Sequence, residues 1–370
     1  MGGASTSLLR AALLCLAVMP AFAAQVIDPA AARRAIAEPT VAAAGATLSA
    51  LAESGRTSEL ALQVRRISID RTLEPVAREW LLDRGLHALA RLQPTPEARA
   101  VVQLLAGRPP EVFGRIDPDH GDHATPLYDT GATARFVLRA WQRSDARAAA
   151  EADLTAGRTQ LIERFAASPG GPEREGIIEA IEHAPPARLA VQRNAAAAAM
   201  STGARVDEVA LLLARRLADV ELASLVIGHA DARVALDALR LLPSVMDSQS
   251  AFRLLTEASR RADIASAAML AIGRVARQDA TARSFLFEQI DDPELGASAA
   301  TALSSIDDPA IAAEIGRRLR TTSSDTARRH FVLALQLDGG SAARDELGRF
   351  IATRQGSAQL RSEVRQWLDR

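Results

Sequence analysis

The chain has 370 residues, a formal net charge of −1, a single cysteine and no lysine, so every basic side chain other than histidine is an arginine. This balanced charge offers no basic excess to bind nucleic acid, and the absence of lysine excludes Schiff-base chemistry. Aromatic residues make up only 4% of the chain, too few for extended platforms on which sugars or bases stack.

The first 23 residues have the pattern of a secretory signal peptide. Arg10 is the only charged residue, residues 11–19 are an apolar run, and the small-residue signature AFA ends at position 23. The run is far shorter than the roughly 20 residues of a spanning helix, which favours cleavage after residue 23 over a membrane anchor. We therefore expect an exported protein that has lost its only cysteine, Cys15. The periplasm is the favoured location, with secretion as the alternative.

Helices are expected along the rest of the chain, because apolar residues recur at helical spacing and no stretch alternates convincingly as a strand. The predicted fold class is therefore all-α. In an N-terminal region, 24–167, helices are expected over residues 29–38, 39–53, 58–69, 73–92, 96–105 and 132–167. After a break at the segment SPGGP, further helices are expected over residues 172–183, 186–200, 206–218 and 219–228.

The segment 108–131 does not follow the helical pattern and is expected to be a long loop. It is rich in oxygen and imidazole donors, which can bind a divalent metal ion: Asp117, Asp119, His120, Asp122 and His123. The two histidines are three residues apart rather than four, and the aspartates lack the spacing of an EF-hand. A solvated loop closed by turns is favoured, with a partner-binding loop and a metal site as alternatives.

The tetrapeptide IDDP occurs twice, at residues 290–293 and 306–309. An aspartate followed by proline favours a helix start, because the carboxylate accepts a first-turn N–H and proline tolerates the first helical position. Similar start signals form two series, at Asp231, Asp263, Asp292, Asp325 and Ser357, and at Asp247, Asp279, Asp308 and Ser341. Both series advance by 32, 29 and 33 residues in step, which predicts a repeating two-helix unit.

Two segments of this region, ATALSSIDDPAIAAEIGRRLR and SDTARRHFVLALQLDGGSAARDELGRFIA, resemble HEAT and HEAT-like repeats. The likeness is best over Asp231 to Arg370, although the Val-Arg pair typical of first helices is only partly kept, as Arg233-Val234. The resemblance implies an α-solenoid of antiparallel helix pairs, whose second helices line a concave surface. We expect the repeat array to extend over residues 172–370.

Several arginines fall on the predicted second helices of these pairs. They are Arg253, Arg260, Arg261, Arg283, Arg317, Arg318 and Arg320. Stacked one repeat apart, they could form a stripe that receives an acidic protein partner. An ordinary solvated face, with pairs such as Glu257 with Arg261 and Glu314 with Arg318, is the favoured interpretation.

No nucleophile elbow, phosphate loop, dinucleotide-binding signature or zinc-helix motif occurs in the sequence. We therefore expect an exported α-solenoid scaffold that binds a protein partner and has no cofactor and no catalytic activity. The alternative is a metal-binding protein or metal-dependent hydrolase that uses the Asp/His-rich loop at 117–129.

Overall fold

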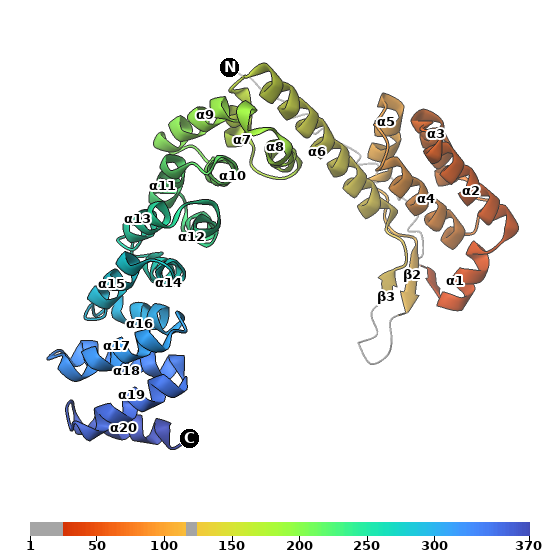
Figure 1. The fold of residues 1–370 in the computed structure, drawn as a ribbon. Helices are drawn as coiled ribbons and strands as arrows, with labels where there is room; N and C mark the ends of the chain where they lie inside the picture. Colours follow the sequence, from red (N-terminus) through yellow and green to blue (C-terminus); the bar gives the residue numbers. More distant parts are fainter. Residues whose placement is uncertain (1–24, 116–123) are drawn as a thin grey trace, which may run out of the picture. The chain divides into compact units, whose positions relative to one another are not determined.

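The computed structural model describes residues 25–115 and 124–370, and these residues are mostly helical (Figure 1). The chain divides into two compact units, residues 1–142 and 143–370. The division falls within a long helix, α6 (Thr130–Ala156). A helix or a helix pair was expected over residues 132–167, and the structure has a pair, α6 followed by α7 (Gln160–Ala167). Each unit has its own packing and is described by itself.

Unit 1 is a bundle of helices around α4. Its helices besides the first part of α6 are α1 (Pro29–Ile36), α2 (Pro39–Glu53), α3 (Thr57–Ile69), α4 (Pro75–Leu89) and α5 (Pro96–Leu105). Four of the five begin at a proline, which fits the first helical position because its missing N–H has no partner there. Helix α4 packs against α1, α2 and α3, and buries Leu82 and Leu86 in the core of the unit.

Unit 1 also contains a small three-stranded sheet, which corrects the expectation of no strands. β1 (Gln25–Ile27) pairs in parallel with β2 (Val112–Arg115), and β2 pairs antiparallel with β3 (Ala124–Pro126). Strands of three or four residues are too short for an alternating pattern, and the β1–β2 pairing joins residues far apart in sequence. The parts of segment 108–131 that the structure describes are therefore partly strand, with Val112 buried against Ala32 and Val76.

Over the described residues, no single helix is long and apolar enough to cross a membrane. Helices α1 and α2 pass that test of length and composition only together, as a pair bent by 68°.

Unit 2 is a succession of short helices joined by tight turns. They are α7 (Gln160–Ala167), α8 (Pro172–His183), the 3-10 helix η2 (Pro186–Arg188), α9 (Ala190–Ser201), α10 (Asp207–Leu217), α11 (Val220–His229), α12 (Ala232–Val245), α13 (Ser248–Ala258), α14 (Ala265–Ala276), α15 (Ala280–Gln289), α16 (Gly296–Ser304), α17 (Pro309–Thr321), α18 (Asp325–Asp338), α19 (Ser341–Ala352) and α20 (Ala358–Leu368).

The predicted helix starts of unit 2 lie at or near real ones. Five of them are N-caps whose side chains accept a first-turn N–H: Asp231, Asp247, Asp279, Asp308 and Ser357. Asp325 and Ser341 are the first residues of their helices. Asp263 and Asp292 precede helices that begin two and four residues later, because a turn comes first. Asp292 still binds the N–H groups of that turn, at 2.8 Å.

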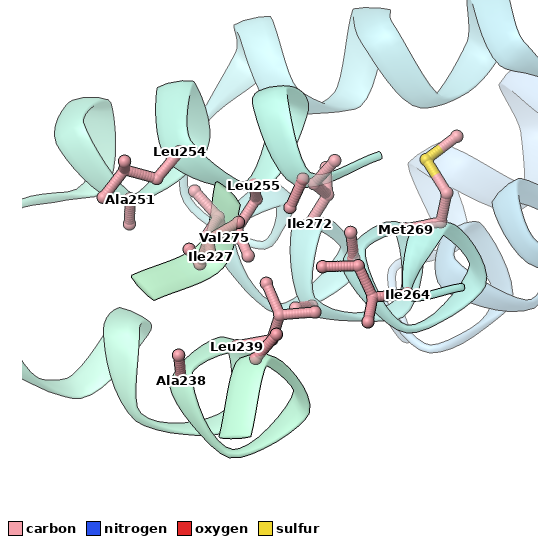
Figure 2. Close-up of a cluster of buried hydrophobic side chains, with 14 of the residues drawn as sticks. Ile227, Ala238, Leu239, Ala251, Leu254, Leu255, Ile264, Met269, Ile272 and Val275 are labelled. Atoms are coloured by element: carbon pink, nitrogen blue, oxygen red, sulfur yellow. The ribbon is translucent and has the colours of Figure 1, made fainter. Parts of the chain in front are cut away.

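Helices of unit 2 pack against the next helix but one as well as against the next. Thus α12 contacts α14, α14 contacts α16 and α16 contacts α18, while α9 contacts α11, α11 contacts α13 and α17 contacts α19. One continuous apolar core runs through the unit. Figure 2 shows part of it, where Ile227, Leu255 and Val275 from α11, α13 and α14 lie together.

Small residues allow close approach within this core. A side chain at Gly273 of α14 would begin 3.0 Å from Ala302 of α16, closer than ordinary contact. The alanine-rich sequences of α14 and α16 therefore permit tight packing between next-but-one helices, in addition to favouring helix formation.

Candidate functional site

The proposed metal ligands Asp117, Asp119, His120, Asp122 and His123 lie outside the described residues. Within residues 25–115 and 124–370, no group of three or more His, Cys, Asp or Glu side chains is placed to hold a metal ion. Asp129, at the end of the same segment, caps α6 by accepting the N–H of Ala132 at 2.7 Å.

A buried polar network lies where segment 108–131 leaves and rejoins the helices of unit 1. Glu79 of α4 is fully buried and accepts hydrogen bonds from Arg108, at 3.1 Å, and from the hydroxyl of Thr130. Glu111 accepts a hydrogen bond from Arg108 at 2.6 Å and is also ion-paired with Arg78. The network thus ties α4 to both ends of the segment.

Each charge in this network has a partner of opposite sign, which lowers the cost of burying it. Burial raises the pKa of Glu79, whereas the hydrogen bond from Thr130 and the charge of Arg108 act in the opposite direction. Arg108 also donates to the carbonyl oxygen of Ser68, at 2.9 Å. We interpret the network as structural, because its polar groups bind one another across the bundle. Sequence analysis missed it, since its members are far apart in the chain.

Unit 1 also has a groove of about 670 Å³ between α2 and α4, whose lining includes Trp80, Arg84 and His87. Arg84 donates to the hydroxyl of Ser49 at 2.9 Å, and its guanidinium lies 5.6 Å from the centre of the Trp80 ring. The guanidinium of Arg84 therefore already contacts the chain and the face of Trp80.

Two of the arginines proposed for partner binding donate to backbone carbonyls of their own chain. Arg261 donates to the carbonyl oxygens of Ile227, at 2.5 Å, in the last turn of α11, and of Ala230, at 2.8 Å, the residue that follows α11. Arg283 donates to Ala276 at the end of α14, at 2.7 Å. Cations are favourable at helix C-termini, where carbonyl groups lack intrahelical partners.

Three more of these arginines bind carboxylates. Arg317 and Arg318 share Glu314, at 2.8 and 2.6 Å, and the hydrogen bond from Arg317 is the main reason why the pKa of Glu314 is lowered. Arg320 is ion-paired with Glu346, a buried side chain. The expected pair of Glu314 with Arg318 is therefore present, whereas Arg261 pairs with Asp263 rather than with Glu257.

The remaining two, Arg253 and Arg260, line one groove of about 650 Å³ on α13. Both side chains are exposed, and neither forms a hydrogen bond or ion pair with the part of the chain that the structure describes. Glu257 lies between them in sequence and lines the same groove; its carboxylate accepts the hydroxyl of Ser224 at 3.1 Å and has no cationic partner among the described residues.

The groove lies between α13 and the start of α15. These two helices do not pack along their lengths as α17 and α19 do. Phe252 and Phe285, both half-buried, meet edge to face with ring centres 5.7 Å apart, and Phe252 lines the groove. Asp279 and Thr281, at the start of α15, complete the opposite wall. Of the seven arginines, the structure thus brings two together at a surface that a ligand can reach.

Comparison of the chain with known proteins finds no matching family model, no matching curated protein and no matching solved structure.

Proposed function

We propose that the chain is an exported α-solenoid of HEAT-like helix pairs that acts as a protein-binding scaffold. The spacing of several long-range hydrogen bonds in unit 2 supports the repeat. Partners are separated by 31 residues for Arg261 and Ala230, 32 for Arg216 and Ala184, and 34 for Gln192 and Arg158. These separations are close to the interval between predicted helix starts, as expected if equivalent positions of neighbouring units meet.

The packing of next-but-one helices supports the same proposal. In an array of helix pairs, each first helix lies beside the first helix of the next pair, and each second helix beside the next second helix. The contacts from α12 through α14 and α16 to α18 follow this pattern. Export, most simply to the periplasm, is supported by the pattern of residues 1–23.

The groove on α13 is the observation that carries the binding function. Most proposed partner-binding arginines are engaged inside the chain, so Arg253 and Arg260 are the two cations left to receive an acidic protein. Exposed arginines that stabilise nothing within their own chain are suited to contact a partner, since binding then breaks no internal hydrogen bond.

The test is a pull-down from cell-envelope extract at low and high ionic strength. We expect the double variant Arg253→Glu, Arg260→Glu to lose proteins that the wild type captures at low salt, with a smaller difference at high salt. The matched control is Arg274→Glu, Arg329→Glu, which makes the same charge change at exposed arginines on α14 and α18. Recovery of the same proteins by all three would rule out the groove as the binding surface.

The competing hypothesis is a metal site in segment 117–129. Elemental analysis of the purified protein separates the two. We expect no stoichiometric divalent ion, and a bound ion that is lost in the variant His120→Ala, His123→Ala would favour the metal-binding function instead.

A further inference from the structure

We propose that the α13–α15 groove binds an amphipathic helix of a partner protein whose facing residues read acidic, basic, acidic. This inference rests on the proposed scaffold function and specifies the ligand of the same groove. It follows from three unpaired charges, an aromatic floor and a gap between neighbouring helices.

The charges of the groove are arranged in a fixed order along α13. Arg253 and Glu257 are four residues apart, and Arg260 follows three residues later in the turn that closes the helix. Side chains at such spacing share one face of a helix, and the outer two lie roughly 10 Å apart along its axis. None of the three forms an ion pair with the described part of the chain. A ligand with the opposite order of charges would pair with all three.

An aromatic floor favours a ligand that also has an apolar face. Phe252 is half-buried beside Phe285 and is the large apolar side chain that lines the groove. A helix carrying one apolar stripe and one charged stripe can place the first on this floor and the second along the charges of α13. Arg253 and Arg260 are themselves seven residues apart on α13 and the turn that follows it. Two acidic residues seven apart on a ligand helix therefore have the same separation along the helix axis.

The gap between α15 and α17, the next one along unit 2, is largely filled by a side chain of the protein itself. Between α15 and α17, which likewise do not pack along their lengths, the guanidinium of Arg318 lies 4.4 Å from the centre of the Phe287 ring. Arg318 is also held by Glu314 at 2.6 Å, and the remaining hollow is about 260 Å³. The groove between α13 and α15 has a volume of about 650 Å³. Within the described residues, neither Arg253 nor Arg260 stacks on an aromatic ring. Side chains of a helix from another protein can therefore enter this hollow, as the side chain of Arg318 enters the next one.

The experiment measures binding of designed helical peptides to the purified full-length protein by fluorescence anisotropy. One peptide has a leucine stripe beside Glu, Lys and Glu at positions i, i+3 and i+7, and a second has Lys at i+4, to cover both directions in which a helix can lie. The controls have every charge inverted. We expect the better acidic–basic–acidic peptide to bind about tenfold more tightly than its inverted control, since three exposed ion pairs together contribute about that factor.

The charge-swapped protein Arg253→Glu, Glu257→Arg, Arg260→Glu provides the decisive comparison. It should prefer the inverted peptide, and circular dichroism will verify that it remains folded. Equal binding of both charge orders, or an unchanged preference in the charge-swapped protein, overturns the inference. If the peptides show no preference but the double variant still loses partners from extract, the groove binds protein with another chemistry, and only the inference fails.

Discussion

Arginine has two different roles in unit 2, and the structure distinguishes them residue by residue. Arg261 donates to two carbonyl oxygens at the end of α11, and Arg216 reaches the carbonyl of Ala184 at 2.6 Å. These side chains connect one part of the chain to another about one repeat away. Arg253, in contrast, binds nothing within the described chain. Arginines of the first kind should matter for stability and those of the second kind for binding.

This difference predicts opposite effects of two alanine substitutions. Arg261→Ala should lower the free energy of unfolding by about 1–3 kcal/mol, because two carbonyl groups lose a charged donor. Arg253→Ala should change it by less than about 0.5 kcal/mol, as at other exposed positions without partners. Urea-induced unfolding followed by circular dichroism measures both. Equal effects of the two substitutions would refute the division into stabilising and free arginines.

The pair of Arg193 with Asp219 predicts a pH dependence. Asp219 accepts a hydrogen bond from Arg193 at 2.7 Å and caps α11 by accepting the N–H of Leu222 at 2.8 Å. The hydrogen bond from Arg193 is the main reason that the pKa of Asp219 is lowered. A carboxylate whose pKa is lower in the folded state stabilises that state above its unfolded pKa of about 3.9, and the contribution is lost as pH falls through the folded pKa.

Asp219→Asn isolates the charge from the cap, because asparagine caps helices about as well as aspartate. We expect this variant to cost about 1 kcal/mol at pH 7, since the pair is partly exposed, and the cost to shrink as pH falls below about 3.9. Urea unfolding of both proteins at several pH values provides the measurement. A difference that stays constant down to pH 2.5 would contradict the role of the ion pair.

At the scale of elements, helix starts were predictable because their signals are local. Pro29, Pro39 and Pro96 mark starts that the sequence placed correctly, and Asp247 and Asp308 are N-caps as predicted. Such signals depend on one side chain and the N–H groups of the next turn, so they need no knowledge of the fold.

The missed elements depend on distant partners. The sheet needs β1 beside β2, and the network of Glu79 needs Arg108 and Thr130 from other parts of unit 1. For the same reason the sequence predicted one stripe of seven arginines. It could not identify those that bind carbonyl or carboxylate groups of their own chain. Within the described residues, Arg253 and Arg260 are the two of the seven that line the α13–α15 groove.

The N-cap of α17 can be tested by a single substitution. Asp308→Ala should cost about 0.5–2 kcal/mol of stability, because the N–H of Ala310, 2.8 Å from its carboxylate, loses its acceptor. Asp263→Ala serves as the comparison, since Asp263 is exposed and binds Arg261 rather than a first-turn N–H, and it should cost at most about 1 kcal/mol. Thermal unfolding will rank the two, and a larger loss for Asp263→Ala would contradict the capping account.

At the scale of the whole molecule, we propose that unit 2 is built from repeating helix pairs. Its helices contact near neighbours, and its core is continuous from α7 to α20. In such an array each pair contributes its own stability and its contacts to the adjacent pairs. One pair should therefore be removable as a whole, whereas half a pair should not be.

Deletion of residues 263–291 tests this claim most directly, because it removes α14 and α15 and brings Asp292 into the place of Asp263. Far-UV circular dichroism should show the same helical content per residue as the intact protein, with cooperative unfolding at a lower temperature. Deletion of residues 279–291 alone is the control; it removes α15 and leaves α14 without its partner, and should reduce helicity. If deletion of the complete pair abolishes helicity to the same extent as the control, unit 2 is not an array of repeating helix pairs.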